Sequence, residues 1–358
     1  MKTEYDIVIA GAGLAGAAAA VALSTRFSVA VLEAERPAAG ASGAAAGLVN
    51  PFLGRKANPT WRMRDALAAF YRLLDAADAR GLLDARGVLR PAPSPKQADA
   101  FQHTASTHPD LAHWLPPADC QAAFPMLDAP LGALHITTGG ALSLPALIDR
   151  LLATAQAQGA DLIAPARLVG WETEGEAVQA ETTAGTLSAA RLVLALGHGY
   201  TAFRELRALN LHSVKGQTIT VAYPEGWSAE TVPPLSGMGY AVPGADGFVI
   251  GSTYEHSFSD LAPDPAQHDA LRAKAARMLP ALADQPVIHA TAGARVTVPG
   301  TRLPMVGLLP EAPRVWVFTG LGAKGLMMAP MLAEQLAHWF EQPDALPAEV
   351  RVRVAPGS

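Results

Sequence analysis

The feature that most constrains this 358-residue chain is a glycine-rich turn close to its N-terminus. Residues 5–10, Tyr-Asp-Ile-Val-Ile-Ala, are mostly apolar and do not alternate with polar residues, which is typical of a parallel strand buried on both faces. The turn Gly11-Ala-Gly-Leu-Ala-Gly16 follows, and an alanine-rich stretch after it predicts a helix. A second strand over residues 28–33 ends in Glu33. This order of parts predicts a βαβ unit that binds a dinucleotide.

Each residue type in this unit has a physical reason to be there. Gly11 allows the tight turn, Gly13 lets the backbone approach a pyrophosphate, and Gly16 lets the helix pack against the strand. The helix N-terminus offers free amide groups to the phosphates, and a carboxylate about 20 residues further on accepts hydrogen bonds from a ribose. Seven residues are therefore predicted to contact the cofactor: Gly11, Gly13, Leu14, Ala15, Gly16, Glu33 and Ala34.

Composition indicates a globular protein with a large core. Half of the residues are hydrophobic and 16% are charged, which excludes a disordered chain. We find neither a run of about 18 strongly apolar residues nor a signal peptide, and the lone Cys120 suits a reducing compartment, so we expect a cytoplasmic protein without a transmembrane segment. The net charge of −5 does not favour a nucleic-acid partner.

The order of elements predicts an α/β fold with two domains. The apolar run 190–195 ends at Gly197, and a last strand over 315–318 precedes a glycine turn and a helix of apolar residues from 326 to 340. Between 213 and 252, short apolar runs alternate with turns, which predicts an antiparallel sheet. We therefore expect a Rossmann-like nucleotide-binding domain assembled from residues 1–80, 141–212 and 292–358. An α+β substrate domain is expected from residues 81–140 and 213–291.

Three further features favour FAD over NAD as the nucleotide. Residues 40–47 form a loop of small residues that can lie along the extended middle of a cofactor, with the Ser42 hydroxyl available to it. A second strand–glycine–helix turn at residues 320–325 can direct a helix N-terminus at the flavin. Because no second Gly-x-Gly-x-x-Gly follows, a separate nicotinamide-binding domain is not expected.

Five segments resemble, in the correct order, the glycine oxidase and D-amino-acid oxidase family of flavoproteins. They are Gly43-Ala-Ala-Ala-Gly-Leu-Val-Asn-Pro51, Val214-Lys-Gly-Gln217, Tyr240-Ala-Val-Pro243 with Val249-Ile-Gly251, Gly293-Ala-Arg295 with Leu303-Pro-Met-Val-Gly307, and residues 320–330. The resemblance covers essentially the whole chain. The sequence is also similar to the oxidase domain that completes the methylaminomethyl-uridine modification of tRNA, although the methyltransferase half is absent.

The resemblance implies oxidation of a C–N bond in an amino acid or secondary amine, by hydride transfer to the flavin and hydrolysis of the imine. It places Arg295 on the substrate carboxylate and Tyr240 beside the substrate, while Lys324 either adds a positive charge or caps the closing turn. Arg302 is a further candidate for the carboxylate, and Tyr254 is a candidate to line the pocket. The other residues expected at the cofactor are Ser42, Ala46, Gly47, Leu48, Leu168, Gly197, Gly322, Ala323, Lys324, Gly325 and Leu326.

Non-covalent FAD, a small amine or amino-acid substrate and no metal are expected. Three alternatives stay open at this point. A flavin hydroxylase that uses NAD(P)H would carry a Gly-Asp motif where this chain has Gly-Leu-Gly-Ala-Lys-Gly. A flavoprotein that acts on an aminomethylated tRNA base would need a basic track, and a catalytically silent FAD-binding subunit would fit the same motifs. The sequence leaves the substrate, the electron acceptor and the oligomeric state open.

Overall fold

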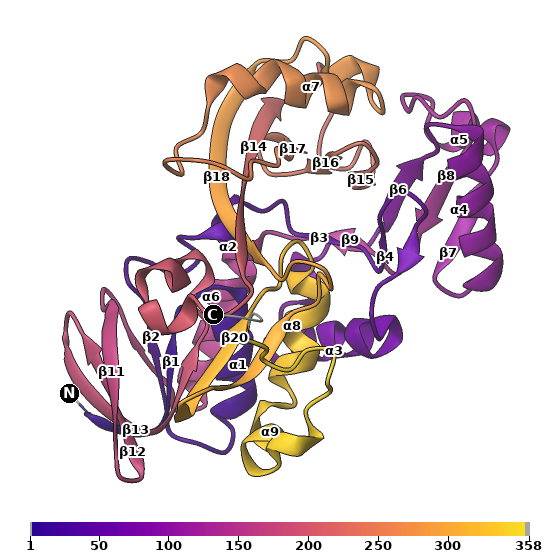
Figure 1. The fold of residues 1–358 in the computed structure, drawn as a ribbon. Helices are drawn as coiled ribbons and strands as arrows, with labels where there is room; N and C mark the ends of the chain where they lie inside the picture. The colour runs from indigo at the N-terminus through magenta and orange to yellow at the C-terminus, as the bar shows by residue number, and fades with distance from the viewer. Residues whose placement is uncertain (1, 355–358) are drawn as a thin grey trace.

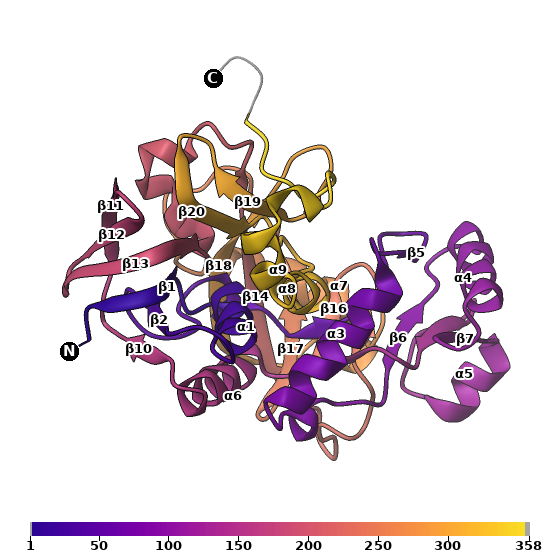
Figure 2. The ribbon, with the colours of Figure 1, turned by 90° about the horizontal axis from the view of Figure 1, so that it is seen from below.

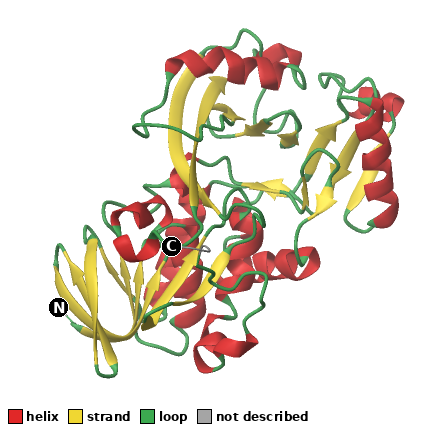
Figure 3. Cartoon of the chain, in the orientation of Figure 1, coloured by secondary structure: helices red, strands yellow, loops and turns green. Residues whose placement is uncertain are grey.

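The structure is a computed structural model that describes residues 2–354, and these residues form two large sheets and two small ones (Figures 1 and 3). The first large sheet has a parallel core in the order β10-β2-β1-β13-β20. Its strands are β1 (Glu4–Ala10), β2 (Val29–Leu32), β10 (Asp161–Ile163), β13 (Gly185–Leu194) and β20 (Ala312–Thr319). In chain order this is the 3-2-1-4-5 arrangement of a Rossmann sheet, so the predicted fold class is confirmed.

Antiparallel strands extend this sheet. The N-terminal half of β13 pairs with β12 (Ala177–Thr182), which pairs with β11 (Leu168–Glu174), while its C-terminal half pairs with β20. The strand β19 (Met305–Leu309) lies antiparallel to β20.

On β1, Ile7 and Ile9 belong to one apolar cluster and Val8 and Ala10 to another. The lack of alternation in the sequence therefore reflects burial of both faces, as predicted.

Helices cover one face of the parallel sheet. The alanine-rich α1 (Leu14–Leu23) contacts α6 (Leu144–Ala157), α8 (Gly325–Ala333) and α9 (Leu336–Glu341), as Figure 2 shows. The helix α3 (Met63–Ala76) packs on α8. Small side chains on α1 allow this close packing, because six of its nine buried residues are alanine or glycine. The single helix expected from 326 to 340 is instead two helices, interrupted at Glu334 and Gln335.

The second large sheet has the order β18-β14-β17-β16-β15-β6-β8-β7, antiparallel except for the β15–β6 pair. Its strands are β6 (Val88–Pro91), β7 (Ala112–Leu115), β8 (Ala133–Ile136), β14 (His212–Ala222), β15 (Leu235–Ser236), β16 (Tyr240–Pro243), β17 (Gly247–Gly251) and β18 (Val287–Thr297). The helix α4 (Pro95–Thr107) packs on β7 and β8, whereas α7 (His268–Ala276) packs on β14 and β17. The antiparallel sheet expected from 213 to 252 is thus present.

Short elements complete the chain. Two are helices, α2 (Ala41–Ala44) and α5 (Pro117–Ala123). Two are small antiparallel pairs, β3 (Leu48–Val49) with β9 (Gly140–Ala141) and β4 (Phe52–Leu53) with β5 (Asn58–Pro59). Short 3-10 helices lie at Arg80–Leu82, Gly197–Ala202, Arg204–Leu206, Pro265–Gln267, Pro280–Leu282 and Pro343–Ala345. The predicted division into two domains stays a prediction. Its boundary at 291/292 falls within β18, and its last segment reaches residues 355–358, which lie outside the described part.

Candidate cofactor cradle and carboxylate-binding arginine

The turn between β1 and α1 requires glycine at two positions for steric reasons. Gly11 has φ +112°, and a Cβ there would lie 2.4 Å from the carbonyl oxygen of Ala195. A Cβ on Gly16 would lie 1.8 Å from the carbonyl oxygen of Gly11. Gly13 differs, because its φ of −79° suits any residue and its Cβ would meet Ser42 Oγ at 3.4 Å, an ordinary contact. The protein itself therefore does not need glycine at position 13, but a pyrophosphate approaching the helix N-terminus does.

Glu33 ties the end of β2 to this glycine turn. Its Oε2 accepts the Ala12 N–H at 2.9 Å, and its Oε1 accepts the Glu35 N–H at 3.0 Å. Its own backbone pairs with Ile163 and Ala166, so the carboxylate is held at the carboxyl end of three parallel strands. The sequence motif predicted a contact between Glu33 and a ribose. The structure adds a second use for the same carboxylate, which is support of the turn.

The small-residue loop lies between the Rossmann turn and the second sheet. Ser42 Oγ accepts the Leu14 N–H at 3.2 Å, which links α2 to the N-terminus of α1. On its other side α2 packs on β18, where a Cβ on Gly293 would lie 2.9 Å from the Cα of Ala41. Gly47 follows with φ +67°, and a Cβ there would lie 1.7 Å from the Leu142 carbonyl oxygen. The loop thus joins the two sheets at the place where the cofactor's middle is expected.

The closing turn before α8 reaches the same region from the other end of the chain. Gly322 donates its N–H to the Val296 carbonyl at 2.8 Å, beside Arg295 on β18. A Cβ on Gly325 would lie 3.1 Å from the Leu14 side chain. Lys324 Nζ donates to the carbonyl oxygen of Arg302, and burial lowers the pKa of this half-buried lysine, with a further decrease from the charge of Arg302. Ala323 is exposed.

The remaining residues expected at the cofactor lie around these loops. Leu168 and Leu326 are buried in two different apolar clusters, and Gly197 is exposed where β13 gives way to a 3-10 turn. Ala34 follows the end of β2, and Leu48 is the first residue of β3. Both residues, like Ala46, are partly exposed. Direct contact of each residue with FAD stays a prediction.

Arg295 lies on β18 in the second sheet, and its guanidinium contacts the residues that follow β17. Its Nη2 donates to Ser252 Oγ at 3.0 Å and to the Thr253 carbonyl at 3.3 Å, and its Cζ lies 4.5 Å from the centre of the Tyr254 ring. None of the ion pairs within residues 2–354 includes Arg295. The guanidinium is partly exposed and keeps donors free for an incoming carboxylate.

Tyr240 lies near both Arg295 and Ser252, and each of them acts to lower its pKa. A Cβ on Gly251, its partner on β17, would lie 2.2 Å from the Tyr240 hydroxyl oxygen, so glycine there makes room for the phenol. Burial raises the pKa of Tyr240 to about 12, which outweighs the opposite effect of the charge on Arg295. Tyr240 therefore stays a neutral hydrogen-bond donor at physiological pH.

This raised pKa predicts a loss of stability in alkali. The phenol is neutral in the folded state up to about pH 12 but ionises near 10.0 when unfolded. Its contribution is therefore full below about pH 10 and is lost as the pH rises towards 12. We expect Tyr240→Phe to weaken the decline in the free energy of unfolding between about pH 10 and pH 12, measured by urea titration. An unchanged decline would show that Tyr240 titrates normally. Tyr5, whose pKa is also about 12, is present in both proteins and cancels in the comparison.

Two contributors to this site were missed by the sequence reasoning. Gly216 lies opposite Gly293, and a Cβ on it would lie 1.7 Å from Arg295 Nη2. Glycine in the interior of a strand signals such a close approach, so this residue could have been found. Ser252 follows β17 and carried no signal, because its place depends on pairing between distant strands.

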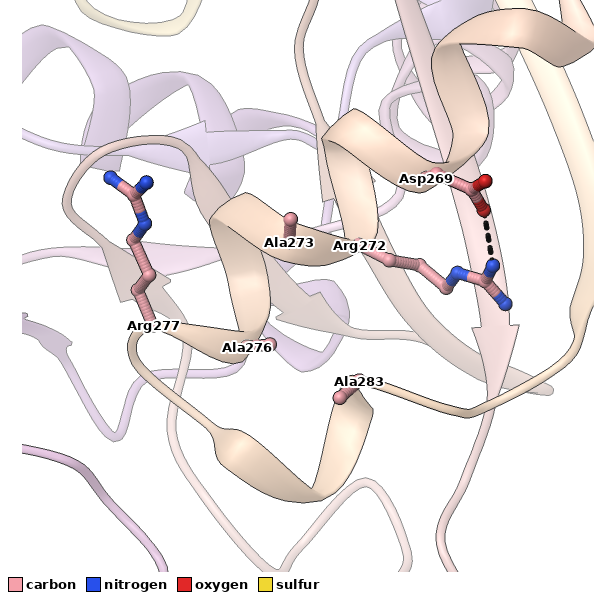
Figure 4. A pocket seen from close by; sticks show the side chains of 6 residues that line it. All are labelled: Asp269, Arg272, Ala273, Ala276, Arg277 and Ala283. Carbon is pink, nitrogen blue, oxygen red and sulfur yellow. Dashed lines mark hydrogen bonds and ion pairs between the residues drawn. The ribbon is translucent and has the colours of Figure 1, made fainter.

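Other surface features lie apart from the cradle. An open hollow on the outer side of α7 is lined by Asp269, Arg272, Ala273, Ala276, Arg277 and Ala283, and Figure 4 shows the Asp269–Arg272 ion pair within it. His198 is half-buried and its Nδ1 forms a hydrogen bond with Ser213 Oγ at 2.8 Å, and burial lowers its pKa. Within residues 2–354 we find no group of three metal-ligating side chains. No helix among them has the length and apolar character needed to cross a membrane.

The parallel sheet, its glycine turn and the acid at the end of β2 define a dinucleotide-binding oxidoreductase fold with a second, antiparallel sheet. The profile of the FAD dependent oxidoreductase family, DAO, matches residues 6–339. The chain belongs to this family, and the predicted cofactor FAD is confirmed by it.

The chain is similar in sequence to bacterial proteins along almost its whole length. The chain is 31% identical to the tRNA 5-methylaminomethyl-2-thiouridine biosynthesis bifunctional protein MnmC of Delftia acidovorans, over 99% of this chain and 60% of that protein. It is 33% identical to the protein of the same name from Thiobacillus denitrificans, over 98% of this chain and 59% of that protein. The chain thus spans about three-fifths of the length of these relatives.

Solved structures share the fold. Glycine oxidase from Geobacillus kaustophilus superposes with a TM-score of 0.82 at 23% identity, covering 96% of this chain and 95% of that chain. L-proline dehydrogenase from P. horikoshii gives the same TM-score and coverage at 18% identity. Iminodiacetate oxidase from Chelativorans sp. BNC1 gives 0.80 at 22% identity, over 94% and 95% of the two chains.

Proposed function

We propose that this protein oxidises the C–N bond of a small carboxylated amine, either an amino acid or a secondary amine. The observation that carries the proposal is the guanidinium of Arg295, which forms no ion pair within residues 2–354 and lies near the neutral phenol of Tyr240 and the closing turn. Bound FAD supplies a two-electron acceptor for the hydride of the substrate α-carbon. The named activities of the three structural neighbours, which act on glycine, L-proline and iminodiacetate, all involve carboxylated amines.

In this proposal the protein's residues bind and orient the substrate. Arg295 on β18 holds the carboxylate through its planar fork, and Tyr240 on β16 donates a hydrogen bond to the substrate. Lys324 adds a positive charge in the closing turn. No side chain needs to act as an acid or base in the hydride step.

FAD is proposed to bind non-covalently across four segments, which we call the cradle. These are the glycine turn at residues 11–16, the end of β2 at Glu33, the small-residue loop at residues 40–47 and the closing turn at residues 320–325. The pyrophosphate of FAD would lie at Gly13 and Ser42, the ribose at Glu33, and the flavin near the closing turn.

The parallel sheet with its helices is proposed as the FAD-binding domain and the antiparallel sheet as the substrate domain. One apolar cluster, which includes Ile219, Phe248 and Ile250, belongs to the antiparallel sheet alone, whereas the cluster of Ile7 and Ile9 extends to Val88 and Ile136 of that sheet.

A substrate panel tests the proposal. The FAD-loaded protein is incubated with glycine, sarcosine, L- and D-amino acids and proline, with a dye as artificial electron acceptor. We expect dye reduction with at least one carboxylated amine, accompanied by the carbonyl product of imine hydrolysis. Dye reduction by NADH alone, with no response to any amine, would favour the hydroxylase alternative.

A second candidate function is supported by the sequence relatives, whose name concerns tRNA 5-methylaminomethyl-2-thiouridine biosynthesis. The substrate would then be an aminomethylated uridine in tRNA. The net charge of −5 does not support a large nucleic-acid surface. Mass spectrometry of nucleosides from tRNA treated with the protein distinguishes this candidate, because only this one predicts a change in a modified uridine.

A further inference from the structure

The two faces of β14 have different tasks. Gly216 and Thr218 face Arg295 and α2, since a Cβ on Gly216 would strike the guanidinium and Thr218 Oγ1 donates to the Ala44 carbonyl at 3.3 Å. Lys215 and Gln217, which alternate with them along the strand, face the other side of the sheet. They contact the segment 252–264, which connects β17 to the turn before α7 and which we call the strap.

Lys215 is the buried charge of this contact. Only 6% of its side chain is exposed, and its Nζ lies 3.9 Å from Glu255 Oε2 and 3.7 Å from Asp260 Oδ1. The backbones of Lys215 and Glu255 also exchange two hydrogen bonds of 2.9 Å. An ammonium buried to this degree is stable only with such partners, so its position and that of the strap depend on each other.

Gln217 holds the two ends of the strap. Its side chain donates to the Asp264 carbonyl at 2.9 Å and accepts the Asp264 N–H at 2.7 Å. Its backbone N–H donates to Thr253 Oγ1 at 2.9 Å, and Thr253 Oγ1 in turn donates to Glu255 Oε1 at 2.8 Å. Glu255 therefore links Lys215 to Thr253 within one network.

The beginning of the strap is also the part that contacts Arg295. Ser252 and Thr253 accept its hydrogen bonds, and Tyr254 lies against its guanidinium. A shift of the strap would move these three partners together. Gly216 on the same strand leaves the guanidinium no alternative support, because it has no side chain to offer.

We propose that Lys215 is a positioning residue, which fixes the strap and through it the orientation of Arg295 towards the substrate carboxylate. The expected effect of Lys215 on substrate binding rests on the proposed function, whereas its expected effect on the position of the strap does not. Lys215 itself does not touch the substrate, since its side chain lies on the opposite face of the sheet from Arg295.

The test is Lys215→Met in the FAD-loaded protein, read out in two ways. Backbone hydrogen exchange over residues 252–264 should become faster, because the Glu255 and Thr253 amides bond to β14. The KM for a carboxylated amine should rise about tenfold with a smaller change in kcat, because small misplacements of orienting groups are costly. Lys215→Arg should restore both values, and Lys96→Met, at an exposed lysine on α4, should change neither.

The outcomes separate this inference from the proposed function. If no carboxylated amine is oxidised by the unmodified protein, the proposed function fails while the exchange measurement still tests the strap. Unchanged exchange in Lys215→Met, or faster exchange with an unchanged KM, would overturn the positioning role. Should Lys215→Met fail to fold, Glu255→Gln weakens the same network from the partly exposed side and is expected to give a smaller change in the same direction.

Discussion

Arg295→Ala is expected to raise the KM for a carboxylated amine about 100-fold while FAD stays bound. Two charge-assisted hydrogen bonds to the carboxylate are lost, at about 1.5–3 kcal/mol each, and part of this loss is regained through solvation. FAD should be retained because Arg295 bonds to the strap and lies outside the glycine turn. Steady-state kinetics and the flavin absorbance of the purified protein measure the two quantities.

Two variants sharpen this prediction. Arg295→Lys keeps the charge but not the planar fork, so its KM should lie between those of the unmodified protein and Arg295→Ala. Arg302→Ala changes an exposed arginine whose carbonyl, but not its side chain, bonds Lys324, so it should have little effect. If Arg302→Ala raised the KM strongly and Arg295→Ala raised it only slightly, Arg302 and not Arg295 would be the residue that binds the substrate carboxylate.

Gly13→Val is expected to weaken FAD binding about 100-fold in a protein that still folds. The backbone at Gly13 suits valine, and its Cβ has an ordinary contact with Ser42, so the chain itself tolerates the change. The added methyl groups occupy the space that the pyrophosphate needs, and overpacking of about 3 kcal/mol corresponds to a roughly 100-fold weaker Kd. Isothermal titration of the FAD-free protein measures this Kd, and its circular dichroism and Tm should match those of the unmodified FAD-free protein.

Gly81→Val is the matched control. A Cβ on Gly81 meets nothing within 4 Å, and this glycine lies in the turn after α3, away from the cradle. It should bind FAD as tightly as the unmodified protein. Full FAD retention by Gly13→Val would contradict the placement of the pyrophosphate at this turn.

The parts of the site that depend on local sequence were predictable. Gly11, Gly16 and Glu33 act within one βαβ unit, and the motif encodes the turn, the helix and the acid together. The break between α8 and α9 was not predicted, because the apolar pattern continues across Glu334 and Gln335.

The surroundings of Arg295 required the tertiary structure. Gly216 and Ser252 come from β14 and from the end of β17, and their meeting with β18 depends on strand pairing over about 80 residues. The family resemblance indicated the arginine, while its neighbours emerged only from the register of three strands. The resemblance included Lys215 within Val214-Lys-Gly-Gln217 but gave it no role, and its contact with the strap became apparent only from the tertiary structure.

Anaerobic mixing of the FAD-loaded protein with sarcosine, glycine or proline tests the central claim most directly. We expect the flavin absorbance of the unmodified protein to bleach with at least one of these carboxylated amines, and that of Arg295→Ala to bleach much more slowly at the same concentration. A flavin that no amine bleaches, but that NADH does, would contradict the assignment of this site to the oxidation of a C–N bond.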